Sequence, residues 1–102
     1  MDRNAAPNYI IGPIKTAADL ERTIGLLIAE LRSKDVSCQA AAEKLESAQR
    51  QADKLAVAKD VNEVGKCPGV LERLMEIARA TGPDVRGTFF DGLIFALSAY
   101  GI

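Results

Sequence analysis

The sequence predicts an all-α protein with one long coiled-coil-like helix, two shorter helices and an extended N-terminal arm. Three observations predict this class. Apolar residues recur alternately four and three positions apart between residues 20 and 55. Glycine and proline are gathered at a few places, which divide the rest of the chain into helix-length segments. A length of 102 residues allows one domain at most.

Composition and charge are those of an ordinary globular protein, with 48% hydrophobic and 26% charged residues. The 13 basic and 14 acidic residues nearly cancel, which leaves a net charge of −1. A nucleic-acid binder or a helix held on an anionic membrane would need a basic excess. We therefore expect neither nucleic acid nor a membrane as a partner.

Residues 1–15 form the expected arm, separate from a single helical domain over residues 16–102. Pro7, Gly12 and Pro13 break any helix there. The arm is either a short strand-like segment laid against the body or disordered when alone. Its apolar contact points are Tyr9, Ile10, Ile11 and Ile14.

The long helix is expected over about residues 17–62. Thr16 can cap its start, with Asp19 three residues later, close to a capping-box arrangement. Between Thr16 and Gly65, Gly25 is the only glycine or proline. Ten of eleven heptad positions are apolar, which is typical of a coiled coil. These positions are Leu20, Ile24, Leu27, Leu31, Lys34, Cys38, Ala41, Leu45, Ala48, Ala52 and Leu55.

Lys34 is the exception, and it has two interpretations. One polar residue on such a seam can set the register of the helix pairing. Alternatively, Lys34 marks a break in the helix within the stretch RSKDVS. The favourable i,i+4 pairs Glu30–Lys34 and Glu46–Arg50 lie on either side of that stretch.

Two shorter helices are expected over residues 68–80 and 84–100. Gly65 suits the position after the end of the long helix, and Pro68 follows it. Gly82 and Pro83 separate the two shorter helices, and proline suits the first turn of the second. Gly92, together with small residues further along, would let another helix approach closely.

The long helix is too long for its partners to cover. Over residues 17–62 it would measure about 69 Å, whereas the returning helices would measure about 18 and 26 Å. The apolar stripe of its first half would therefore be covered by a second copy, by a break near Lys34 that folds it back, or by a partner protein. The predicted interface residues are Leu20, Ile24, Leu27, Ile28, Leu31, Phe89, Phe90, Leu93 and Leu97.

No catalytic, metal or cofactor site is expected. Histidine is absent, which removes His-based nucleophile systems and His-ligated metals. Cys38 is expected to be a packing residue on the heptad seam, and Cys67 an incidental residue of the turn. Two distant cysteines do not suggest a secreted disulfide scaffold, and no signal-peptide pattern is recognisable, so a cytoplasmic location is expected.

These features predict a non-enzymatic protein–protein interaction module, dimeric and able to sequester a partner, with specificity from flanking charges such as Glu21, Arg22, Glu30 and Arg32. The layout of residues 16–102 resembles the small all-helical antiactivators that bind LuxR-type quorum-sensing transcription factors. That resemblance implies a regulatory protein whose partner is a transcriptional regulator. The alternative is a structural or adaptor coiled coil, such as a secretion chaperone or a phage or plasmid accessory protein.

Overall fold

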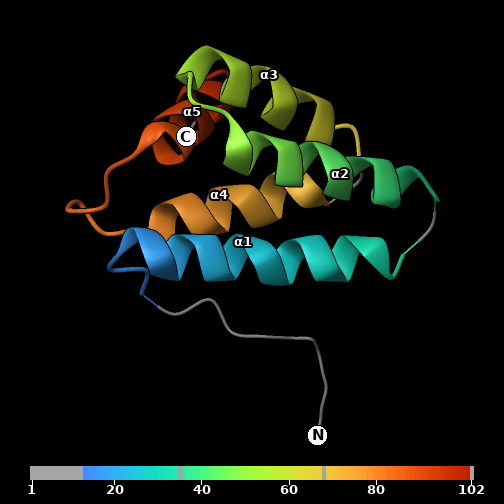
Figure 1. Cartoon of the computed structure of the whole chain (residues 1–102), viewed down its shortest axis with the longest axis horizontal. Coiled ribbons are helices and arrows are strands. Elements are labelled where there is room, and N and C mark those ends of the chain that lie inside the picture. The colour runs from blue at the N-terminus through green and yellow to red at the C-terminus, as the bar shows by residue number, and fades with distance from the viewer. Residues whose placement is uncertain (1–12, 35, 68, 102) are drawn as a thin grey trace, which may run out of the picture.

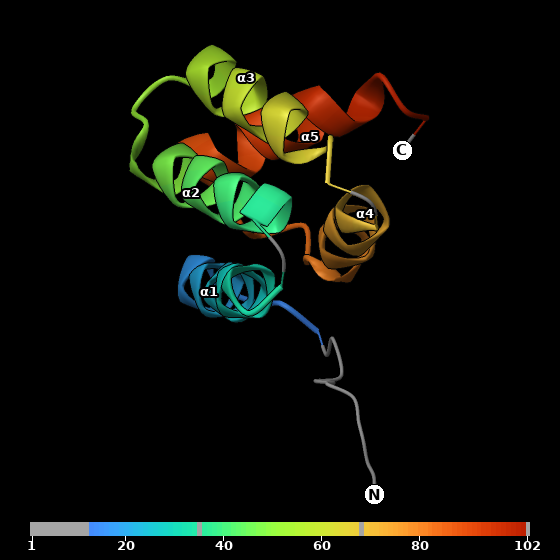
Figure 2. The same ribbon diagram turned by 90° about the vertical axis from the view of Figure 1, so that its right-hand side faces the viewer.

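The computed structural model describes residues 13–34, 36–67 and 69–101, and its regular elements there are all helices (Figure 1). The predicted all-α class is confirmed. Helix α1 lies at one end of the bundle, α2 and α4 flank it, and α3 and α5 form the other end (Figures 1 and 2). The helices are α1 (Ala17–Arg32), α2 (Val36–Arg50), α3 (Lys54–Val64), α4 (Val70–Ala80) and α5 (Thr88–Ser98).

The single long helix is wrong, because residues 17–62 form three helices. The folded part measures 38 × 29 × 25 Å, so a straight helix of about 69 Å does not fit within it. The first break lies beside Lys34, as one of the two interpretations of that residue predicted. The Ser33 hydroxyl donates to the Glu30 carbonyl at 2.7 Å, and such local bonds compete with helix continuation. At the second break the Asp53 side chain accepts from the Ala56 N–H and caps α3.

The apolar positions of the heptad pattern nevertheless pack in the core, where α1 and α2 fold onto each other. Its apolar positions in α1 and α2 are buried as far as Ala48. Beyond that point the pattern fails, since Ala52 is exposed and Leu55 is 56% exposed. In its place α3 buries Val57, Ala58, Val61 and Val64.

The two shorter helices are present as α4 and α5, but both begin later than expected. Pro83 does not start α5. Val85, two residues later, is buried at 2% exposure and anchors the loop that precedes the helix. The Val85 N–H donates to the Gly82 carbonyl, and the helix then starts after Gly87, whose φ is 141°. Gly65 ends α3 with an ordinary φ of −61°, so it does not adopt the left-handed conformation.

The end of the expected arm lies against the body at Ile14, which is 2% exposed. Its N–H donates to the Ala80 carbonyl at 2.9 Å, and its carbonyl accepts from Gly82 at 2.7 Å. This isolated parallel bridge places the chain before α1 against the end of α4. The remaining arm residues, including Tyr9, Ile10 and Ile11, lie outside the described part.

Helices α3 and α5 approach each other closely at Gly92. A Cβ atom added there would lie 2.7 Å from the Lys54 carbonyl oxygen and 2.5 Å from Val57 Cγ1. The expected role of Gly92 in close helix approach is therefore confirmed. Further along α5, Leu93 and Leu97 are fully buried and pack in the core.

Cys38 and Cys67 form a disulfide, so the expectation that Cys67 is an incidental residue of the turn is wrong. Their Cα atoms lie 5.6 Å apart, although 29 positions separate them in the sequence. Both residues are buried, which agrees with the expected packing role of Cys38. The bond ties the first turn of α2 to the turn between α3 and α4.

Candidate protein-binding groove

The predicted interface residues lie mostly in the core of the single chain. The chain covers the stripe itself, because the break beside Lys34 folds α1 back against α2 and α4. The structure of the chain alone does not bear on their contact with a partner, which stays a prediction. Buried are Leu20, Ile24, Leu27, Ile28, Leu31, Leu93 and Leu97, whereas Phe89 and Phe90 are half-buried.

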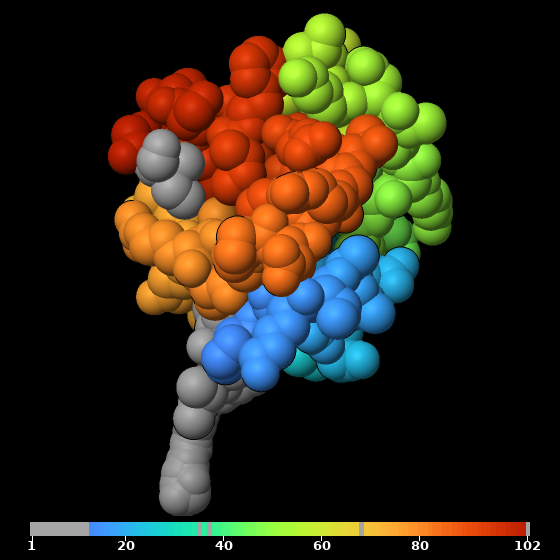
Figure 3. Space-filling model, turned by 90° about the vertical axis from the view of Figure 1, so that its left-hand side faces the viewer, coloured from blue at the N-terminus to red at the C-terminus, as the bar shows by residue number. Residues whose placement is uncertain are grey.

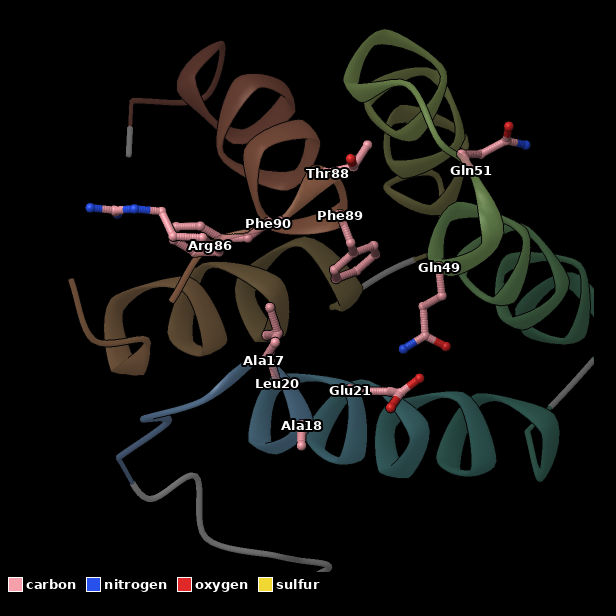
Figure 4. Close-up of a pocket in the computed structure, with 11 residues that line it drawn as sticks. Ala17, Ala18, Leu20, Glu21, Gln49, Gln51, Arg86, Thr88, Phe89 and Phe90 are labelled. Carbon is pink, nitrogen blue, oxygen red and sulfur yellow. The ribbon is translucent and has the colours of Figure 1, made fainter. Parts of the chain in front are cut away.

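Three of these nine residues, Leu20, Phe89 and Phe90, meet in one groove of about 410 Å³ (Figure 4). The groove lies where the start of α1 meets the start of α5 and the end of α2. Figure 3 shows the first of these meetings on one face of the molecule, where α1 adjoins the chain leading into α5. The other lining residues are Ala17, Ala18, Glu21, Gln49, Gln51, Arg86, Gly87 and Thr88.

A complete capping box fixes the α1 side of the groove. The Thr16 hydroxyl accepts from the Asp19 N–H at 3.0 Å, and the Asp19 carboxylate accepts from the Thr16 N–H at 3.2 Å. The Lys15 N–H, which also donates to this carboxylate, is the main cause that holds the pKa of Asp19 below its ordinary value. Hydrogen bonds from Arg22 and Thr16 act in the same direction. The start of α1, with Ala17 and Ala18 on the groove wall, is therefore held in one conformation.

The loop before α5 fixes the two phenylalanines. Val85 is buried at 2% exposure and anchors the loop, while the Arg86 guanidinium donates to the Pro83 carbonyl at 2.8 Å. Gly87 then turns the chain with a positive φ that other residues rarely adopt. As a result Phe89 and Phe90, in the first turn of α5, pack against the core with part of each ring left in the groove.

The rim of the groove is polar and carries both signs of charge. Figure 4 shows Arg86 on one side of the phenylalanines and Glu21 with Gln49 on the other. Neither Glu21 nor Arg86 forms an ion pair within the described part of the chain. The second amide, Gln51, donates to the Ser47 hydroxyl at 3.4 Å.

The other charges that were predicted to flank an interface have partners within the fold. Arg22 pairs with Asp19 at 3.2 Å, and Arg32 pairs with Glu46 at 2.6 Å. Glu30 pairs with Arg73 of α4 at 3.0 Å and with Lys34 at 3.6 Å. Of the four residues predicted to flank an interface, Glu21 is thus the one that lines the groove.

No sequence pattern pointed to a functional role for Gln49, Gln51 or Arg86. They follow no periodic pattern, and they meet only because the chain breaks after Arg50 and turns again before α5. The two phenylalanines were recognisable from the apolar pattern of the final segment. A polar rim assembled from α1, α2 and the segments that follow α2 and precede α5 has no comparable signal along the sequence.

Membrane-spanning helices and metal-binding clusters are the two other kinds of feature to consider in the described residues. Across residues 13–34, 36–67 and 69–101, no helix has the length and apolar character needed to cross a bilayer. In the same part of the chain, no three His, Cys, Asp or Glu side chains are placed to hold a metal ion.

The chain was compared with protein-family models, with curated proteins and with solved structures, and none of them matches it. The function proposed below therefore rests on the geometry and chemistry of the groove.

Proposed function

We propose that the protein is a non-enzymatic binding module that captures a segment of a partner protein in the groove between α1, α2 and α5. The observation that carries this proposal is the meeting of Leu20, Phe89 and Phe90 beneath a charged rim, whose Glu21 and Arg86 form no ion pair with any described residue. Aromatic residues surrounded by polar groups are characteristic of protein-binding hot spots.

The shape of the groove favours a protein segment over an enclosed small molecule. Its volume of about 410 Å³ accommodates one or two large apolar side chains. Most of the lining residues are exposed, so an occupant would keep one side in solvent. A helix or loop of a partner, which inserts apolar side chains and leaves its remaining surface outside, meets both conditions.

The charges on the rim specify the chemistry of that segment. Arg86 and Glu21 stand on opposite sides of the phenylalanines (Figure 4). The complementary segment places an acidic residue near Arg86, a basic residue near Glu21 and a large apolar side chain between them. The amides of Gln49 and Gln51 can donate to and accept from its backbone.

The biological role that we propose is sequestration of a regulatory partner such as a transcription factor. The model for this role is the class of small helical antiactivators, which the sequence resembles in length and helical class. Occupation of the groove would withhold the bound segment from its own dimer or DNA contacts. A homodimer that uses the same groove is the competing occupant, and the experiment below distinguishes the two.

The test combines charge reversal with site-specific crosslinking of the full chain. A benzoylphenylalanine crosslinker at position 90 should trap one companion protein, whereas the same group at Tyr100, which is 49% exposed at the end of α5, should not. Capture should fall at least tenfold in the double variant Glu21→Lys/Arg86→Glu. It should persist in the matched control Glu72→Lys/Arg79→Glu, whose residues are exposed and lie outside the groove.

Three results would overturn the proposal. They are equal crosslinking at positions 90 and 100, capture that survives the groove reversal, and a crosslinked product that contains only this chain. If the companion is a transcription factor, its DNA binding should fall with added wild-type protein and not with the groove variant.

A further inference from the structure

The Cys38–Cys67 disulfide is approached by a second groove, independent of the one described above. This groove of about 500 Å³ runs between α2 and the end of α3, helices that lie side by side in Figure 2. It is lined by Ala40, Ala41, Glu43, Lys44, Ser47, Glu63, Lys66 and Cys67. Both cysteines are buried, at 4% exposure for Cys67 and 6% for Cys38, but Cys67 lies on the wall of this groove and Cys38 does not.

The rim of this second groove matches a small thiol that carries both carboxylate and ammonium groups. Lys44 forms no ion pair within the described residues, and Lys66 pairs with Glu63 at 3.3 Å near the surface. Two ammonium groups therefore stand beside the path to Cys67, with the carboxylates of Glu43 and Glu63 next to them. Glutathione, a tripeptide thiol with two carboxylates and one ammonium group, is a representative of this class.

The groove also sets the direction of the exchange. A thiolate that enters it meets Cys67, whereas Cys38 does not line the groove. Attack at Cys67 with departure of Cys38 is therefore the favoured direction.

We propose that Cys67 is a thiol–disulfide exchange site for anionic low-molecular-weight thiols, reached through the α2–α3 groove. The incoming thiolate bonds to Cys67 Sγ, the Cys38–Cys67 bond breaks, and Cys38 leaves as a thiolate that takes a proton from water. A second thiolate then attacks the mixed disulfide and releases Cys67. Overall, two small thiols are oxidised to their disulfide and the two cysteines are reduced.

The exchange has a structural consequence at the start of α2. In the oxidised chain the bond holds that helix to the turn between α3 and α4. Reduction removes this covalent tie and leaves the rest of the core in place. The disulfide thereby couples the attachment of α4 to the supply of small thiols.

The test is to treat the oxidised full-length protein with glutathione under native conditions, quench with acid and map the adduct by mass spectrometry. The first mixed disulfide should be on Cys67, with Cys38 as the alkylatable thiol. The double variant Lys44→Glu/Lys66→Glu should react with glutathione at least about threefold more slowly, because the reagent is anionic. Its rate with uncharged 2-mercaptoethanol should be unchanged.

The matched control is Lys59→Glu, which changes an exposed lysine of α3 that does not line this groove. If the double variant does not fold, the single variant Lys44→Gln gives the same comparison with a smaller change. An adduct on Cys38, equal slowing by Lys59→Glu, or reaction only at denaturant concentrations that unfold the protein would each overturn the proposal.

Discussion

Replacement of Gly92 by alanine should destabilise the protein, although alanine is the better helix former. The new methyl group would lie 2.5 Å from Val57 Cγ1 and 2.7 Å from the Lys54 carbonyl oxygen. Neither atom is the end of a flexible side chain, so α3 and α5 must move apart by about 1 Å to reach ordinary contact distance. Overpacking of this kind costs about 1–3 kcal/mol.

Two further contributions set the net effect of this substitution. A gap of about 1 Å along the remaining α3–α5 contact forfeits up to half of each pairwise attraction, which raises the cost. The exchange of glycine for alanine within a helix returns about 1 kcal/mol. We expect the free energy of unfolding to fall by about 1–2 kcal/mol.

Gly25 provides the matched control within α1. A Cβ atom added there meets nothing within 4 Å, and the residue is exposed. Gly25→Ala should therefore stabilise the protein by up to about 1 kcal/mol through helix propensity alone. The two substitutions make the same chemical change and should differ in sign.

The assay is urea denaturation followed by circular dichroism at the helix band. With a denaturant slope of about 1–2 kcal/mol per molar, a loss of about 2 kcal/mol lowers the midpoint by about 1–2 M. The reasoning would be refuted if Gly92→Ala were as stable as wild type, or were stabilised to the same extent as Gly25→Ala. Either result would mean that α3 and α5 do not cross at this residue.

Three further predictions concern bonds between and within the helices. The double variant Cys38→Ser/Cys67→Ser should lose about 3–4 kcal/mol of unfolding free energy, because the bond closes a loop of about 30 residues. Denaturant titration measures this loss, and unchanged stability would contradict the prediction. Ser47→Ala should lower the free energy of unfolding by about 1–2 kcal/mol in the same titration, because the Ser47 hydroxyl donates at 3.0 Å to Asp60, which is 8% exposed. The control Ser98→Ala should change that free energy little, because the Ser98 hydroxyl, which donates to the Phe95 carbonyl, belongs to an exposed residue. The pKa of Asp19 is lower in the folded state, so the stability that its carboxylate contributes is present above the unfolded pKa and is lost as pH falls through the folded pKa. The difference in urea midpoint between wild type and Asp19→Asn should therefore shrink below about pH 4. A constant difference would show that ionisation of Asp19 plays no part.

The sequence was sufficient for the helical class and for the local chemistry at helix ends. Thr16 and Asp19 form the capping box that their spacing indicated, and the pairs Glu30–Lys34 and Glu46–Arg50 are both present, at 3.6 and 3.7 Å. These features depend on residues within one helical turn of each other. Local spacing therefore predicts them without knowledge of the fold.

Features that depend on distant segments were not predictable in the same way. A heptad pattern is satisfied by a continuous coiled coil and equally by α1 and α2 folded onto each other. The bond from Ser33 to Glu30 and the cap at Asp53 mark the breaks that the folded arrangement requires. A disulfide requires Cα atoms within about 7 Å, which spacing along the chain does not reveal. The rim of the binding groove has the same origin, since Arg86 reaches it from a loop that is positioned by a buried valine.

The bridge at Ile14 has a mechanical consequence. Ile14 is itself hydrogen-bonded to Ala80 and Gly82, where the loop that positions Arg86 and Phe89 begins. Tension applied from the N-terminal side would thus pull first on the root of that loop and only afterwards on α1. A tether, a fused domain or a surface attached upstream would in this way be able to tune the opening of the groove from a distance.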